Sequence, residues 1–248
     1  MKWNETGKEI YDLLRLRTPP VGVVFSDRDE IPEDAFLPSK HGLQWAVCQA
    51  IAFARFTERT VAMKYEDFAC PPSMIIYGQV KGDLREILVK AGWIKDAECE
   101  VNEDFLPPGK YKTFVFGSLN KMNIQPQAII IYGRPAQIGR LIQAKTYFGG
   151  RIKADLFSKA ASCFEALGPA MKGEAAISIP GAGDRVFSAI EEDEMIFAAP
   201  YEWLDKITEG LRSAGKGINI SYPIVPFLFY TPRFPKIYKE AQEKFERV

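Results

Sequence analysis

The stretch AIIIYGRPAQIGRLIQAKTY, residues 128–147, gives the clearest local signal for the fold. Ala128–Tyr132 is an uninterrupted apolar run rich in isoleucine, which is typical of a buried strand. Gly133-Arg134-Pro135 then predicts the start of a helix, because proline is favoured in a first helical turn, and Gly149-Gly150 ends it. We therefore expect a buried strand that leads directly into a helix in the middle of the chain.

Segments on both sides of this unit read as strands or helices, without a regular strand–helix–strand order. Strands are predicted at Val21–Ser26, Ser73–Tyr77, Lys112–Phe116, Ala175–Ile179 and Met195–Ala198. Helices are predicted at Thr6–Arg17, Gln44–Phe56, Asp83–Ala91, Ser158–Leu167, Tyr201–Ala214 and Pro235–Arg247. The irregular order favours the α+β class, with a mixed β-sheet and packed helices. Because no linker-like tract interrupts the chain, we expect a single domain over residues 1–248.

The composition excludes several classes of protein. The chain has 248 residues, of which 47% are hydrophobic, so it has ample material for a packed core. Lys plus Arg and Asp plus Glu both number 32, which disfavours nucleic acid as a partner, because nucleic-acid binders usually carry a basic excess. No apolar run approaches the roughly twenty residues of a membrane span, and the N-terminus lacks the apolar core of a signal peptide. We therefore expect a cytoplasmic protein with reduced thiols and no membrane partner.

Four cysteines are the most distinctive chemical feature of the chain. Cys48, Cys70, Cys99 and Cys163 are widely separated and form no CxxC pair, so only the fold can assemble a shared site. Glutamates flank Cys99 on both sides and argue against a reactive thiolate there. The other three are candidate ligands of zinc or an iron–sulfur cluster, or redox thiols. The alternative is that Cys48 and Cys163 are small apolar residues on helical faces.

The turn PGAGDR, residues 180–185, is the strongest candidate for binding a small anionic molecule. Gly181 and Gly183 permit a close backbone approach, and Arg185 offers a bidentate charge for phosphate or carboxylate. The alternative is an ordinary strand exit in which Asp184 caps a short helix at Arg185–Ile190 and Arg185 pairs with a nearby carboxylate. The turn does not match a nucleotide-binding fingerprint.

The helix start at YGRPAQ, residues 132–137, is a second candidate for anion binding. Free backbone amides at a helix N-terminus attract anions, and Arg134 and Arg140 lie at this end of the helix. The alternative is a normal turn with solvated arginines. The single histidine, His41, lies in a polar loop, so hydrolase machinery is not indicated and no reaction is predicted.

Several segments in their order along the chain resemble a known family. They are PPVGVVF (19–25), WAVCQAIAFAR (45–55), DFACPPS (67–73), YGRPAQIGRLIQA (132–144), SCFEALG (162–168), PGAGDRVFSAI (180–190) and APYEWLDKITEGL (199–211). Together they are similar to the domain of unknown function 169 family of archaeal and bacterial cytoplasmic proteins. The resemblance implies a fold and a cytoplasmic setting but no reaction. The cysteines in matching segments are Cys48, Cys70 and Cys163.

Three functional hypotheses follow from these observations. The first is a pocket in which Cys48, Cys70 and Cys163 bind a metal or cluster beside an anion held at PGAGDR. The second is a non-catalytic module that recognises a small anionic metabolite through Arg134, Arg140 and Arg185. The third is a homo-oligomeric scaffold that associates through the apolar stretch Tyr222–Tyr230.

Overall fold

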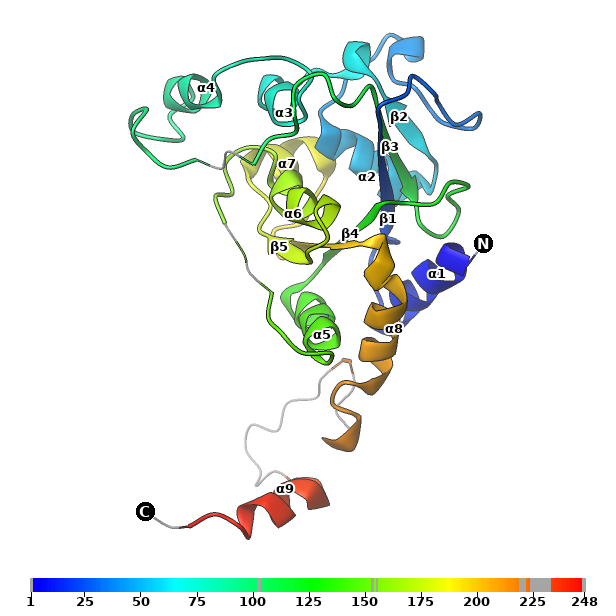
Figure 1. The fold of residues 1–248 in the computed structure, drawn as a ribbon, viewed down its shortest axis with the longest axis vertical. Helices are drawn as coiled ribbons and strands as arrows, with labels where there is room; N and C mark the ends of the chain where they lie inside the picture. The colour runs from blue at the N-terminus through cyan, green and yellow to red at the C-terminus, as the bar shows by residue number, and fades with distance from the viewer. Residues whose placement is uncertain are drawn as a thin grey trace.

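A computed structural model describes residues 2–101, 104–152, 154, 156–218, 222–223 and 233–246. Within these residues, one sheet of six strands in the order β2-β3-β1-β4-β6-β5 is flanked by helices (Figure 1). The strands are β1 (Val21–Ser26), β2 (Val61–Met63), β3 (Thr113–Ser118), β4 (Ala128–Gly133), β5 (Ala176–Ser178) and β6 (Met195–Pro200). The helices are α1 (Lys2–Leu14), α2 (Val47–Thr57), α3 (Pro71–Ile76), α4 (Leu84–Lys90), α5 (Pro135–Thr146), α6 (Ser162–Met171), α7 (Ala182–Ser188), α8 (Leu204–Ser213) and α9 (Lys236–Gln242). The α+β class predicted from the sequence is confirmed.

Every pair of neighbouring strands in this sheet is antiparallel, so the prediction of a mixed sheet was wrong. The reason is the position of β1. Val21 of β1 lies opposite Ser118 of β3 on one side and Ile130 of β4 on the other. Strands β3 and β4 therefore run in the same direction, but β1 separates them and no parallel ladder forms.

The strand β4 is buried on both faces, which explains its continuous apolar sequence. Ile130 and Tyr132 belong to the hydrophobic cluster that includes residues of α2, α3 and α6. Ile129 and Ile131 point to the opposite face and belong to the cluster formed with α1, α5 and α8. Figure 1 shows α2, α3, α6 and α7 together in its upper half, whereas α5 and α8 lie in its lower half.

Two of the predicted elements differ from the structure. The segment Ser73–Tyr77, predicted as a strand, lies largely in α3, because the prolines before it fit the first turn of a helix. Gly168-Pro169 was expected to end a helix, yet α6 continues to Met171 with Pro169 inside its last turn. The turn PGAGDR leads into a helix as predicted, but α7 begins at Ala182 rather than Arg185.

One further prediction concerns the C-terminal part of the chain. The apolar stretch Tyr222–Tyr230 lies outside the described residues except for positions 222 and 223, so the oligomerisation hypothesis stays a prediction.

Among the helices that the structure describes, none combines the length and the apolar character that crossing a bilayer requires.

A buried ion pair connects α2 to the turn that precedes β6. Arg55 of α2 contacts Glu194 at 2.5 Å between Nη2 and Oε1, and both side chains are at most 4% exposed. The Arg55 Nε also donates a hydrogen bond of 2.8 Å to Thr18 Oγ1. Its guanidinium carbon lies 3.9 Å from the centroid of the Tyr132 ring on β4. One side chain thus joins a helix, the central strand and the turn after α7.

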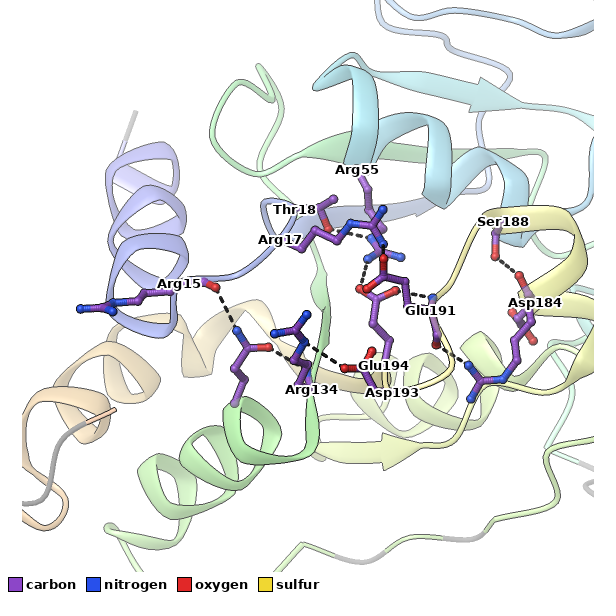
Figure 2. Close-up of polar contacts among 12 residues, drawn as sticks. Arg15, Arg17, Thr18, Arg55, Arg134, Asp184, Ser188, Glu191, Asp193 and Glu194 are labelled. Atoms are coloured by element: carbon purple, nitrogen blue, oxygen red, sulfur yellow. Dashed lines mark hydrogen bonds and ion pairs between the residues drawn. The ribbon is translucent and has the colours of Figure 1, made fainter. Parts of the chain in front are cut away.

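Other arginines bind the same acidic turn, residues 191–194, as Figure 2 shows. Arg17 contacts Glu191 at 2.5 Å, and Arg134 contacts Asp193 at 3.0 Å. Arg185 donates a hydrogen bond to the Glu191 carbonyl oxygen. These outer pairs are roughly half exposed, so solvent screens them, whereas the pair between Arg55 and Glu194 is shielded from water.

Replacing Arg55 should therefore destabilise the protein much more than replacing an outer arginine. We expect Arg55→Met to lower the free energy of unfolding by about 3–5 kcal/mol, because Glu194 is left buried without its partner. Arg134→Ala should cost about 0–1 kcal/mol, as for other exposed pairs. Denaturant unfolding measures both values. Equal losses for the two variants would show that the buried pair does not hold this region together.

Candidate functional site

The three cysteines singled out in the sequence line one hollow of about 290 Å³. It lies where the first turns of α2, α3, α6 and α7 meet the C-terminal part of α4, and all five helices contribute to its wall. Most of the wall is apolar, formed by residues such as Val47, Ile87, Leu88, Trp93 and Phe187. The polar groups in the wall are the three thiols, Ser73, Lys159 and Asp184.

Each of these cysteines lies at the start of a helix. Cys48 is the second residue of α2, Cys70 directly precedes α3, and Cys163 is the second residue of α6. Local sequence explains two of the starts. The Gln49 side chain accepts a hydrogen bond of 2.8 Å from the Ala46 amide, and two prolines follow Cys70.

Burial controls the protonation of the three thiols. Burial raises the pKa of Cys48, Cys70 and Cys163 above the ordinary thiol value. Hydrogen bonds from the backbone amides of Gln49 to Cys48 and of Ser73 to Cys70 oppose this rise in pKa but do not cancel it. The Cys163 Sγ also lies 3.5 Å from the hydroxyl of buried Tyr77. The thiols are therefore protonated at neutral pH and weakly nucleophilic.

Asp184 is the group in this wall whose role could not be read from the sequence. It lies in the first turn of α7, is 4% exposed, and its Oδ1 has no hydrogen-bond partner. Burial raises the pKa of its carboxyl group, although hydrogen bonding from Ser162 acts in the opposite direction. Its position beside Gly183 in the PGAGDR turn was a signal, but the sequence suggested only a helix cap.

The donor groups surround the hollow instead of converging on one point. Among the described residues, no three His, Cys, Asp or Glu side chains are arranged so that they could hold a single metal ion. The thiols nevertheless lie close enough to influence one another, because the charges of Cys70 and Asp184 contribute to the raised pKa of Cys48.

The residues predicted to bind an anion are engaged elsewhere, except for Gly183, which lines the hollow. The Gly181 amide donates a hydrogen bond of 2.9 Å to Ser162 Oγ. Arg134 and Arg185 bind the acidic turn 191–194. Arg140 is buried and donates hydrogen bonds of 3.0 and 3.1 Å to the carbonyl oxygens of Leu211 and Ala214. The three arginines therefore do not line the hollow, and their role in anion binding stays a prediction.

Cys99 and His41 do not line the hollow. The Cys99 Sγ lies 3.6 Å from Asp96 Oδ1. The His41 ring stacks on Phe36 with 4.5 Å between ring centroids, so it takes part in a surface aromatic cluster.

The burial of the thiols leads to an alkylation test on iron-free protein. We expect iodoacetamide to modify Cys48 and Cys163 about tenfold or more slowly than half-buried Cys99, because both burial and raised pKa values lower the reactive thiolate fraction. Peptide mass spectrometry measures the rates. In denaturant the difference should disappear, and equal rates in the folded protein would contradict the described burial.

Comparison with known proteins agrees with the resemblance seen in the sequence. The profile of the domain of unknown function 169 (DUF169) family, described as uncharacterised ArCR, matches residues 9–210. A relative from Methanocaldococcus jannaschii, the uncharacterized protein MJ0308, is 25% identical over 219 residues, which cover 84% of this chain and 93% of the relative. No solved structure matches the chain. The match over most of the chain establishes that this protein belongs to the DUF169 family.

Proposed function

We propose that the protein binds an iron–sulfur cluster in the hollow, through the thiolates of Cys48, Cys70 and Cys163. One observation carries this proposal: three cysteines from distant parts of the chain line the same hollow, each at the start of a different helix. Three isolated core cysteines would have no reason to share a cavity. Proteins hold iron–sulfur clusters mainly through cysteine thiolates.

The spacing of the donors favours a cluster over a single ion. A tetrahedral zinc site needs its sulfur ligands about 2.3 Å from one point. No group of the described residues provides that arrangement, whereas the hollow that the three thiols help to line has a volume of about 290 Å³. In a cluster each thiolate binds a different iron atom, so the sulfur ligands are farther apart than they are around a single ion.

The surroundings act on thiolate ligands in both directions: burial and the Asp184 carboxylate raise the pKa of the three thiols, whereas other groups favour the thiolate. The starts of α2 and α6 bring the positive ends of two helix dipoles to the hollow. The backbone amides of Gln49 and Ser73 lower the pKa of Cys48 and Cys70 and so favour their thiolate forms. Apolar walls limit solvent access, which is one of the factors that set a cluster's reduction potential.

The protein's own residues would bind and shield the group. Uptake replaces the thiol protons with iron, since metal ligands must be thiolates. A bound cluster would supply one-electron redox chemistry. We place this function in the cytoplasm, where thiols remain reduced.

Zinc is the second candidate, because the same three thiols are suitable zinc ligands. It would require the first turns of α2, α3 and α6 to move closer together around one ion. A small anionic ligand has less support, because the predicted arginines bind other groups.

Metal analysis of protein purified without oxygen tests the proposal. We expect iron and acid-labile sulfide in equal amounts and an absorbance band at about 400 nm. Cys48→Ser, Cys70→Ser and Cys163→Ser should each lose most of the iron, because a ligand is removed. Cys99→Ser is the matched control and should keep the wild-type content, since Cys99 lies outside the hollow.

Two results would contradict the cluster proposal. Zinc without sulfide would support the second candidate instead. Iron that is absent, or present equally in all four serine variants, would show that the thiols of the hollow do not bind it.

A further inference from the structure

The three thiols leave one corner of a four-iron cluster without a protein ligand. Such a cluster has four iron atoms, and each takes one ligand from outside the cluster. Cys99 cannot fill the fourth position, because it lies outside the hollow. Asp184 is the acidic residue in the wall, and it comes from α7, the one helix start there that carries no cysteine.

We infer that Asp184 supplies a carboxylate oxygen as the fourth ligand, so that three irons are bound by thiolates and one by oxygen. This inference rests on the proposed function and adds to it the identity and the chemistry of the fourth position.

Ser162 hydrogen-bonds to the Asp184 carboxylate, but only one of the two carboxylate oxygens is satisfied. The residue is 4% exposed, yet its Oδ1 has no hydrogen-bond partner. No lysine or arginine within the described part of the chain forms an ion pair with it. A buried carboxylate is normally paired with a cation or a metal, because removing it from water is costly. Bound iron would provide the missing partner.

Glu165 is a nearby buried carboxylate whose hydrogen bonds are complete, and it serves as a comparison for Asp184. Glu165 of α6 is also buried, but both of its oxygens are satisfied. Its Oε1 accepts a hydrogen bond of 2.9 Å from the Ser158 amide, and its Oε2 accepts one of 2.8 Å from the Ser178 hydroxyl. Glu165 does not line the thiol hollow. The unsatisfied carboxylate is therefore the one beside the thiols.

The iron bound by the Asp184 oxygen would be lost more easily than the three irons bound by thiolates. Thiolate is the softer ligand and suits cluster iron better than carboxylate does. On mild oxidation, a four-iron cluster gives one electron to ferricyanide and then releases one ferrous ion, which leaves a three-iron cluster on the thiolates. The ferricyanide is reduced to ferrocyanide, so atoms and electrons balance.

The experiment uses the full-length chain, reconstituted anaerobically with ferrous iron and sulfide and then treated with ferricyanide. We expect the wild type to release one ferrous ion per cluster, detected with a chelator, and to gain the electron paramagnetic resonance signal of a three-iron cluster. Asp184→Cys should retain that iron, with release slowed about tenfold or more, because a thiolate replaces the oxygen. Asp193→Cys is the control for an added surface thiol and should behave as the wild type, since Asp193 is half exposed on the turn 191–194.

A second variant keeps the test decisive if Asp184→Cys does not fold or assemble a cluster. Asp184→Ala should then give mainly the three-iron form directly after reconstitution, because the fourth ligand is gone. Wild-type release kinetics in Asp184→Cys, or a wild-type four-iron content in Asp184→Ala, would overturn the inference and leave the thiol site intact. Failure of the wild type to assemble any cluster would overturn the inference together with the proposed function.

Discussion

The buried contact between Arg55 and Glu194 fixes the part of the fold on which the hollow depends. Arg55 belongs to α2, which carries Cys48, and Glu194 ends the turn that follows α7, which carries Asp184. The same guanidinium lies over Tyr132 of the central strand β4. Two walls of the hollow are thus held at a set distance by one charged pair that water does not reach. The exposed ion pairs of Arg17 and Arg134 with the same turn contribute little to stability.

The way in which helices cover the sheet brings the three cysteines together. Helices α2, α3 and α6 contribute to the cluster on one face of the sheet, and their first turns meet at one hollow. Unpaired amides at such turns favour negative charge. The opposite face is closed by α1, α5 and α8, where Gly210 permits the close approach of α8 to α5: a Cβ at this position would lie 2.2 Å from the Ala144 oxygen.

Local patterns predicted the elements well, and contacts between distant residues decided the rest. The strand β4 and the helix α5 were readable because an apolar run and a proline start are local signals. The antiparallel sheet was not, because it depends on β1 lying between β3 and β4. Arg185 and Arg140 looked available for a ligand, yet their partners, the carbonyl oxygens of Glu191 and Leu211, could not be identified from the sequence. Asp184 was missed as a site residue for a similar reason, since only the fold brings it beside thiols from other helices.

The most direct test of the central claim is a crystal structure of anaerobically prepared protein with data collected on both sides of the iron absorption edge. The account predicts an anomalous difference peak inside the hollow, within bonding distance of the sulfurs of Cys48, Cys70 and Cys163. Well-ordered free thiols around a hollow without iron, or iron bound at another place on the chain, would contradict it.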